Sequence, residues 1–356
     1  MSWRSGLIQG HKKCVASYLA IAHPDATVIA MYRGGHQRTK RAAIALATAL
    51  IATTACTPPH PANTPAQSTN ADGATQAPDT AGRQAVIAQI RGVDVCALYG
   101  AKTAVAGRSL AVQAPRTITG CPAQIGAPAE DLSSTIYLVV GPPQLPTQES
   151  WVKHENIGDT EVSIADSQNA PNAPPRDQVV SSTCDVSARY PGSVVLSAVV
   201  SMPPAIDGCQ IGKELMQIAI AEFAKRPPHG TSAAPRTVLT GIDPCRPIAR
   251  LNSTHNIVWN IADTDTRSCA FTIDASPEIL VSLEYLDPET DKYQPQHFQV
   301  NGHNVSGDLH DGIFNVVVGP QFPSEKGSRV PAMEIADLAK NMDRIKLLAQ
   351  AIADDF

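Results

Sequence analysis

The densest group of potentially reactive side chains lies in residues 302–312, which read Gly-His-Asn-Val-Ser-Gly-Asp-Leu-His-Asp-Gly. His303, Asp308 and His310 could ligate zinc or supply an acid–base pair, and His297 lies shortly before them. Gly, Asn and Asp are also the residues of turns, and a predicted strand follows at residue 313. We therefore expect a solvated loop, and we predict no catalytic residue, no metal and no cofactor. An extracytoplasmic hydrolase that uses His303, Asp308 and His310 is the alternative.

Other residues with possible chemistry have a structural interpretation. The sequence contains no G-x-S-x-G, H-E-x-x-H, phosphate-binding or dinucleotide-binding motif. Asp94 and Asp243 each stand two residues before a cysteine, where we expect them to cap a short helix. Trp151, in a long insert at residues 148–175, is predicted to contact a partner, whereas Trp259 is predicted to lie in the core.

The N-terminal region indicates an exported lipoprotein. Basic residues precede the apolar run 42–52, which is too short to cross a bilayer and is followed by Thr-Thr-Ala-Cys56. A cysteine after small residues resembles a bacterial lipobox, so Cys56 is the predicted lipid attachment residue. Cleavage after Ala55 as an ordinary signal peptide is the alternative. We expect translation to start at Met31, which makes residues 1–30 an upstream extension and residues 31–55 the signal peptide.

The composition of the predicted exported part of the chain indicates a disordered tether and an excess of acidic residues. Residues 57–83 contain no Val, Ile, Leu, Met or aromatic residue, so residues 56–83 are predicted to be a disordered tether. The whole chain has a net charge of −5. Residues 1–55 hold seven basic residues and one acid, so the exported part has 21 Lys and Arg against 32 Asp and Glu, a net charge of −11. This excess of acid disfavours nucleic acid and anionic lipid surfaces as partners.

An internal repeat predicts two tandem copies of one domain. Residues 90–96 and 239–245 both read apolar-x-Gly-apolar-Asp-x-Cys, and the next cysteine follows 25 and 24 residues later. Residues 193–203 and 314–320 are interpreted as equivalent apolar strands. The predicted domains are residues 84–226 and 236–356, and the Pro-containing residues 227–235 are the predicted linker.

Each copy is predicted to be an α+β domain, with an antiparallel sheet packed by a C-terminal helix and by a short helix after the Asp-x-Cys motif. We expect copy two to fold alone, with Leu338 in the interface between helix and sheet. The apolar residues of its predicted helix recur at steps of three and four: Ile335, Leu338, Met342, Ile345, Leu348 and Ile352. Residues 211–223 show the same period in copy one. The predicted strands are residues 135–140, 194–200, 257–261, 269–273, 279–285 and 313–318.

The repeat also assigns the disulfide bonds among the six cysteines that follow Cys56. Copy two contains only Cys245 and Cys269, which must pair if this copy folds alone. Equivalence between the copies then assigns one bond in copy one, and the two remaining cysteines form the last. The predicted bonds, in the oxidising compartment that an exported chain enters, are Cys96–Cys121, Cys184–Cys209 and Cys245–Cys269.

The motif Asp243-Pro244-Cys245 and the sequence Cys269-Ala-Phe271 resemble the actinobacterial lipoproteins of unknown function that share a short Asp-Pro-Cys motif. This resemblance implies a lipobox, a tether rich in Pro and Thr, and one such domain. The chain departs from the pattern by carrying two copies, by Val95 in place of the proline, and by Pro122 directly after Cys121.

These observations predict a non-catalytic binding or scaffolding module of the cell envelope. A lipid on Cys56 would hold it on the outer face of the cytoplasmic membrane, with the tether as a spacer. Its predicted partners are an envelope protein or a small-molecule ligand, and no nucleic acid.

Overall fold

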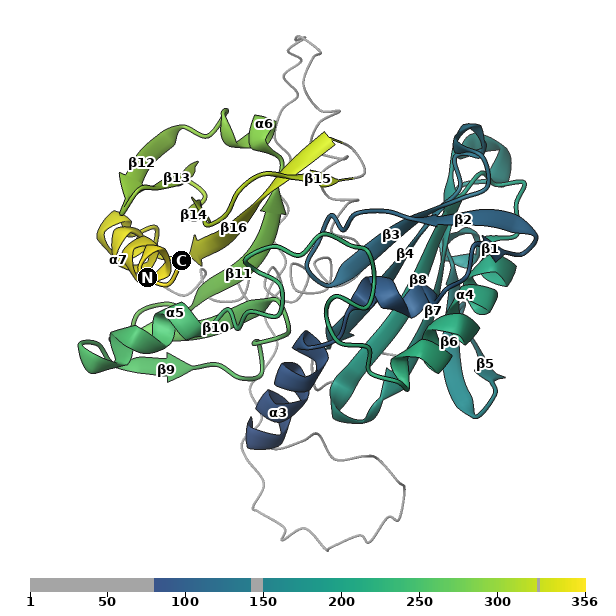
Figure 1. Cartoon of the computed structure of the whole chain (residues 1–356), viewed down its shortest axis with the longest axis horizontal. Coiled ribbons are helices and arrows are strands. Elements are labelled where there is room, and N and C mark those ends of the chain that lie inside the picture. The colour runs from purple at the N-terminus through teal and green to yellow at the C-terminus, as the bar shows by residue number, and fades with distance from the viewer. Residues whose placement is uncertain (1–79, 142–149, 325–326) are drawn as a thin grey trace, which may run out of the picture. The chain divides into compact units, whose positions relative to one another are not determined.

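The computed structural model describes residues 80–141, 150–324 and 327–356. It is an α+β structure with two antiparallel sheets, and residues 75–356 form one compact unit (Figure 1). The predicted start at Met31, the signal peptide and Cys56 lie outside the described residues. Within the described ranges, no helix is both long enough and apolar enough to span a membrane.

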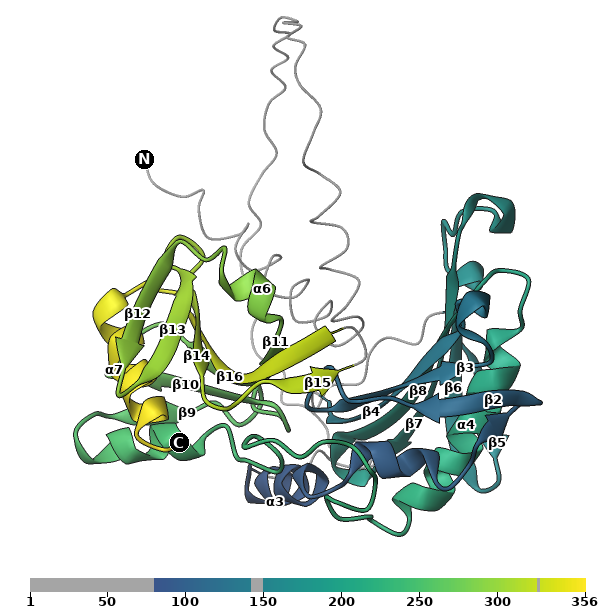
Figure 2. The same ribbon diagram turned by 45° about the horizontal axis from the view of Figure 1, so that its top comes forward.

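Sheet 1 buries one face beneath helices. Helix α4 (Gly208–Phe223) packs on its strands β7 and β8, and α3 (Thr80–Arg91) packs near β4 (Figures 1 and 2). Alternate residues of β4, such as Ile136 and Leu138, face these helices, as expected of a strand with one buried face. The sheet order is β1-β2-β3-β4-β8-β7-β6-β5. Its strands are β1 (Ala104–Val105), β2 (Arg108–Val112), β3 (Gly120–Ile125), β4 (Ser133–Val140), β5 (Lys153–Ile157), β6 (Thr160–Asp166), β7 (Ser182–Tyr190) and β8 (Val194–Met202).

Sheet 2 is built in the same way beneath α7 (Met342–Ala353), which packs on β12, β14 and β16 and on the short helix α5 (Arg246–Ala249). Its order is β12-β13-β14-β16-β11-β10-β9, and β15 pairs with β16 beside this path. A further short helix, α6 (Pro288–Asp291), precedes β12. The strands are β9 (Ile257–Trp259), β10 (Ser268–Ile273), β11 (Ile279–Leu286), β12 (Gln296–Val300), β13 (His303–Asp308), β14 (Ile313–Val317), β15 (Phe322–Ser324) and β16 (Gly327–Asp337).

The two sheets follow the same order when β1 and β15 are left aside. Read along each sheet, β2-β3-β4-β8-β7-β6-β5 corresponds to β9-β10-β11-β16-β14-β13-β12. The predicted match of residues 193–203 with residues 314–320 is therefore wrong by one strand, because β8 occupies the place of β16 and not that of β14. Both β8 and β14 are apolar and contain adjacent valines, which explains the mismatch.

The predicted disulfide bonds are confirmed. They join Cys96 to Cys121, Cys184 to Cys209 and Cys245 to Cys269, with Cα–Cα distances of 5.1, 5.2 and 5.2 Å. Cys96–Cys121 attaches a short helix to β3, and Cys245–Cys269 attaches a short helix to β10. These are the second strands of the two matching sheet orders. The short helix is a 3-10 helix, η1 (Val95–Tyr99), in the first half and α5 in the second.

The closing helix of the second half begins later than predicted. Ile335 lies in β16, and Leu338 lies in the following turn with 59% of its surface exposed. The helix begins at Met342, where the Asn341 side chain accepts hydrogen bonds from two backbone amides. The prediction failed because Ile335 near the end of β16 and Leu338 in the turn are spaced like residues on one face of a helix.

Three predicted loops contain regular structure. The insert at residues 148–175 holds the hairpin of β5 and β6, and residues 303–308 form β13. Helix α3 begins at Thr80 and so includes residues 80–83 of the predicted tether. Arg83 is buried within this helix and donates to the carbonyl oxygens of Gly141, at 2.9 Å, and of Ile261 and Thr264, each at 3.0 Å. Arg83 thus connects residues that precede sheet 1 with the segment between β9 and β10.

The two leucines of the second half give a matched test of this packing. Leu348 is fully buried in the core beneath α7, so Leu348→Asp places an unpaired charge there and should lower the free energy of unfolding by several kcal/mol. Leu338→Asp should change it by less than about 0.5 kcal/mol because Leu338 faces solvent. Denaturant unfolding of the exported chain measures both. Equal losses for the two variants would contradict the helix boundary.

Candidate functional site

The residues of the alternative hydrolase do not converge. His303 and Asp308 stand at opposite ends of β13, which for five residues of strand is roughly 17 Å, and an odd separation directs them to opposite faces of the sheet. His303 Nδ1 lies 2.9 Å from the carbonyl oxygen of Val317, and Asp308 accepts from the amide of His310. Across the described ranges, no three His, Cys, Asp or Glu side chains group to hold a metal ion. The reactive pattern in the sequence is therefore a strand and its turn.

Asp94 is the N-cap of η1, as predicted, but the prediction for Asp243 is wrong: α5 begins three residues after Asp243, and its N-cap is Cys245, which makes no side-chain capping bond. Asp94 Oδ1 accepts from the backbone amides of Cys96 and Ala97 at 3.2 and 3.4 Å, and Asp243 Oδ1 accepts from that of Cys245 at 3.0 Å. Each second oxygen has a further partner. Asp94 Oδ2 accepts from the backbone amide of Ser232 at 2.8 Å, and Asp243 Oδ2 pairs with Arg91 at 3.2 Å. The predicted linker 227–235 is therefore bonded to the first motif.

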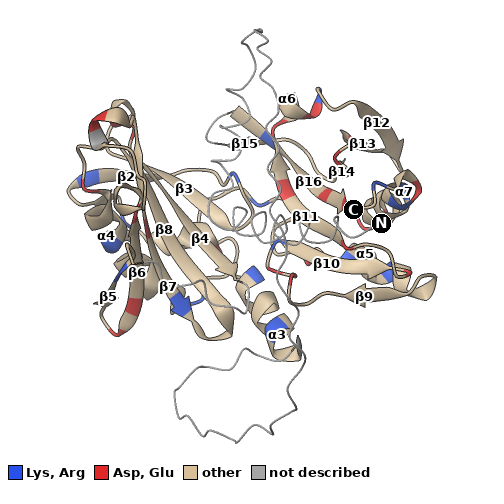
Figure 3. Ribbon diagram, turned by 180° about the vertical axis from the view of Figure 1, so that it is seen from behind, with Lys and Arg blue, Asp and Glu red and all other residues tan. Residues whose placement is uncertain are grey.

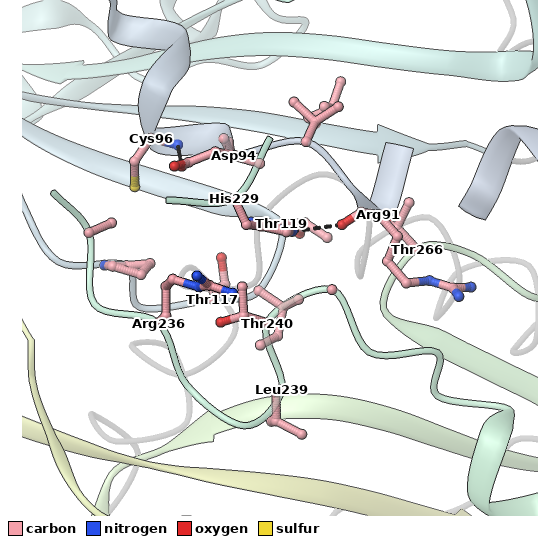
Figure 4. Close-up of a pocket in the computed structure, with 18 of the residues that line it drawn as sticks. Arg91, Asp94, Cys96, Thr117, Thr119, His229, Arg236, Leu239, Thr240 and Thr266 are labelled. Carbon is pink, nitrogen blue, oxygen red and sulfur yellow. Dashed lines mark hydrogen bonds between the residues drawn. The ribbon is translucent and has the colours of Figure 1, made fainter. Parts of the chain in front are cut away.

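A small hollow lies beside this motif (Figure 4). It has a volume of about 70 Å³, which holds a few water molecules and is well below the 300–1,000 Å³ of ordinary ligand sites. His229, the histidine that lines it, directs Nε2 at the carbonyl oxygen of Arg91, 2.8 Å away, and Asp94 is occupied by its capping bonds. The Thr266 hydroxyl is buried there without a hydrogen-bond partner, which water in the hollow would satisfy. This hollow offers no pair of nucleophile and base.

The distal faces of the sheets, meaning the faces turned away from α4 and α7, are more informative. In sheet 1, strands β3, β4 and β8 contain no charged residue, and Figure 3 shows these strands almost entirely in tan. The distal residues of β4 and β8 are serine, threonine, valine and Tyr137, and Asp185 accepts hydrogen bonds from Ser187 at 2.6 Å and from Ser197 at 2.5 Å. The distal face of sheet 1 is thus of mixed polarity and nearly uncharged at its centre.

One polar row crosses each distal face at the same position. The strand register places these residues directly opposite one another from strand to strand, in the same sheet order. The row of sheet 1 is His154, Ser163, Ser187, Ser197 and Tyr137, and the row of sheet 2 is His297, Ser306, Asn315, Glu334 and Ser282. The cysteines occupy matching positions as well. Cys121 is opposite Ile136, the residue before Tyr137 of the row, and Cys269 is opposite Val281, the residue before Ser282.

Acidic side chains distinguish the row of sheet 2. Burial raises the pKa of the Glu334 carboxyl to about 7; Glu284 on the next strand raises it as well, and Arg267 opposes them. Arg267 itself pairs with Glu284 at 3.1 Å. Opposite Glu334, the side-chain oxygen of Asn315 is buried without a hydrogen-bond donor. A protonated Glu334 carboxyl would supply that donor, which agrees with the direction of its pKa.

A larger hollow lies at the outer end of the same face. It measures about 390 Å³ and is lined by residues of α6, β12 and β13, among them Asp291, His297, Gln299 and Asn304. Gln299 donates to Asn304 at 2.9 Å, and Ser306 donates to Asp291. His297 carries no catalytic pairing, because the Ser306 proton goes to Asp291 and not to the imidazole. The hollow is lined mainly by polar side chains.

The two tryptophans have different outcomes. Trp259 is half-buried and packs against Phe271, with ring centroids 5.8 Å apart, so it lies at the margin of the core and not within it as predicted. Trp151 is half-buried beside β5, and its predicted contact with a partner stays a prediction.

Comparison of the chain with protein-family models, with curated proteins and with solved structures found no match.

The buried acid of the polar row predicts a pH dependence. The unfolded chain loses the Glu334 proton near pH 4.5, whereas the folded chain keeps it to about pH 7. The contribution of Glu334 to the free energy of unfolding is therefore fully present below about pH 4.5 and is lost as the pH rises to about 7. Glu334→Gln should flatten this fall, measured by denaturant unfolding from pH 4 to 8. Exposed Glu289→Gln is the control, and a Glu334→Gln profile parallel to that of the parent would contradict the assignment.

Proposed function

We propose that this chain is a non-catalytic binding module, displayed on the outer face of the cytoplasmic membrane by a lipid on Cys56. One observation carries the binding role: on the face opposite its closing helix, each sheet carries a polar row at the same strand positions, and the histidines at the outer end of that row, His154 and His297, are exposed. The side chains with possible chemistry are occupied in hydrogen bonds to the backbone. An envelope protein or a small-molecule ligand is the proposed partner.

Two tandem copies of one domain are part of this proposal. Seven strands in the same order and cysteines at the same register support duplication, since neither property follows from the presence of an α+β sheet alone. The Asp-x-Cys motif supports membership among the Asp-Pro-Cys lipoproteins. Three disulfide bonds fit an oxidising compartment outside the cytoplasm. The net charge of −11 after export argues against nucleic acid as a partner.

The lipid anchor is tested by changing its attachment residue. Cys56→Ala should release the full chain from the membrane fraction into the medium or the soluble extracytoplasmic fraction, because a short apolar leader cannot span the bilayer. Ser68→Ala is a matched control, since Ser68 lies in the predicted tether and carries no lipid. Membrane fractionation followed by immunoblotting measures both variants. If Cys56→Ala stays with the membrane as the parent does, the anchor lies elsewhere.

A further inference from the structure

The outer hairpin of each sheet carries the same ten-residue pattern. Residues 154–163 read His-Glu-Asn-Ile-Gly-Asp-Thr-Glu-Val-Ser, and residues 297–306 read His-Phe-Gln-Val-Asn-Gly-His-Asn-Val-Ser. Both begin with histidine, carry an amide two positions later and end with Val-Ser. No residue is inserted or deleted between them. The hairpins β5–β6 and β12–β13 that contain them hold equivalent places in the shared sheet order.

The two hairpins also share their pairing. His154 is opposite Ser163, and His297 is opposite Ser306. Two pairs further on, on the same face, Asn156 is opposite Glu161, and Gln299 is opposite Asn304. Both hairpins turn through two residues, Gly158-Asp159 and Asn301-Gly302. A histidine, an amide and a serine therefore occupy the same places on the two distal faces, whereas Glu161 corresponds to Asn304.

Packing does not explain why these polar residues match. Val162 and Val305 face the cores, where a common apolar residue is expected. The histidines and amides are exposed, and almost any polar residue would serve there. The rest of the row has diverged, since Ser197 and Tyr137 correspond to Glu334 and Ser282. The match thus includes the exposed His154 and Asn156 of one hairpin and the exposed His297 and Gln299 of the other, which a ligand can reach, whereas Ser306 is buried.

The side chains of each hairpin restrict the chemistry of that ligand. An imidazole, an amide and a hydroxyl provide hydrogen-bond donors and acceptors at short spacing. Each set has a carboxylate nearby: Glu161 lies 3.5 Å from His154 Nδ1, and Asp291 accepts from Ser306. A carboxylate beside the site repels an anionic ligand, and a single carboxylate provides too few oxygen ligands for a metal ion. Ligands rich in hydroxyl groups match these donors and acceptors.

We propose that the hairpins β5–β6 and β12–β13 are two equivalent binding sites for a neutral, polyhydroxylated ligand, the chemistry presented by a glycan chain. The hollow of about 390 Å³ beside His297 lies within the size range of small-ligand sites and accommodates sugar residues. This inference deepens the proposed function, on which it rests, by naming the ligand class. Two sites on one chain would bind a polymeric glycan more tightly than either site binds an oligosaccharide. Binding at the first site raises the effective concentration of the same glycan at the second.

The first experiment measures each site separately. The exported chain carrying Cys56→Ala is titrated with chitotetraose and with maltotetraose, and backbone amide shifts are followed by NMR. Shifts confined to residues 153–166 and 296–308 are expected with at least one tetrasaccharide, and the preferred one identifies the type of sugar. His154→Ala and His297→Ala should each weaken binding at their own hairpin by at least fivefold and leave the other hairpin unchanged. His310→Ala, in an exposed turn outside both sites, should change neither.

The second experiment tests the two sites together. Cosedimentation with purified peptidoglycan should fall at least tenfold in apparent affinity for the double variant His154→Ala/His297→Ala, while each single variant falls less. Thermal melting of each variant checks that the fold is intact. Glycan binding that is unchanged in the double variant, or no binding of any of these glycans by the parent, would overturn the inference. Membrane anchoring through Cys56 is measured independently, so either proposal can fail without the other.

Discussion

Both halves of the chain depend on attaching a short helix to the second strand of a sheet, and a disulfide bond does this in each half. Cys96–Cys121 and Cys245–Cys269 each close a loop that costs the unfolded chain conformational freedom, about 3.5 kcal/mol in a chain-entropy estimate. Asp94 caps η1, which carries Cys96, and Asp243 accepts from the backbone amide of Cys245, the N-cap residue of α5. The disulfide bond thus fixes which face of each sheet the short helix covers.

The closing helices of the two halves, α4 and α7, are attached to their sheets in different ways. In the first half, Cys184 on β7 is bonded to Cys209 in the first turn of α4. In the second half, the fully buried Asp337 carboxylate at the end of β16 pairs with Arg344 in α7 through both carboxylate oxygens. Removing either partner of such a buried pair leaves an unpaired charge, which is strongly destabilising. A covalent bond and an ion pair thus hold corresponding helices.

The sequence predicted the features that local chemistry specifies and missed those that depend on the sheet. The Asp94 cap, the disulfide bonds and the apolar strands have strong residue signals. The edge hairpins do not, because one face of each is solvated and their polar residues resemble a loop, as at residues 303–308. Leu338 was misplaced because a strand end and a turn imitated helical spacing. Direct comparison of residues 154–163 with residues 297–306 would have found the shared hairpin, since their spacing is identical.

The two halves of the structure are built alike, and each holds its own disulfide bonds. Peptide mapping of the protein from membranes, under non-reducing conditions with free thiols blocked at lysis, is the decisive measurement for this arrangement. Three bridged peptide pairs are expected, Cys96–Cys121, Cys184–Cys209 and Cys245–Cys269, with no free thiol among these six residues. A bond that joins Cys245 or Cys269 to a cysteine of the first half, or six free thiols, would contradict it.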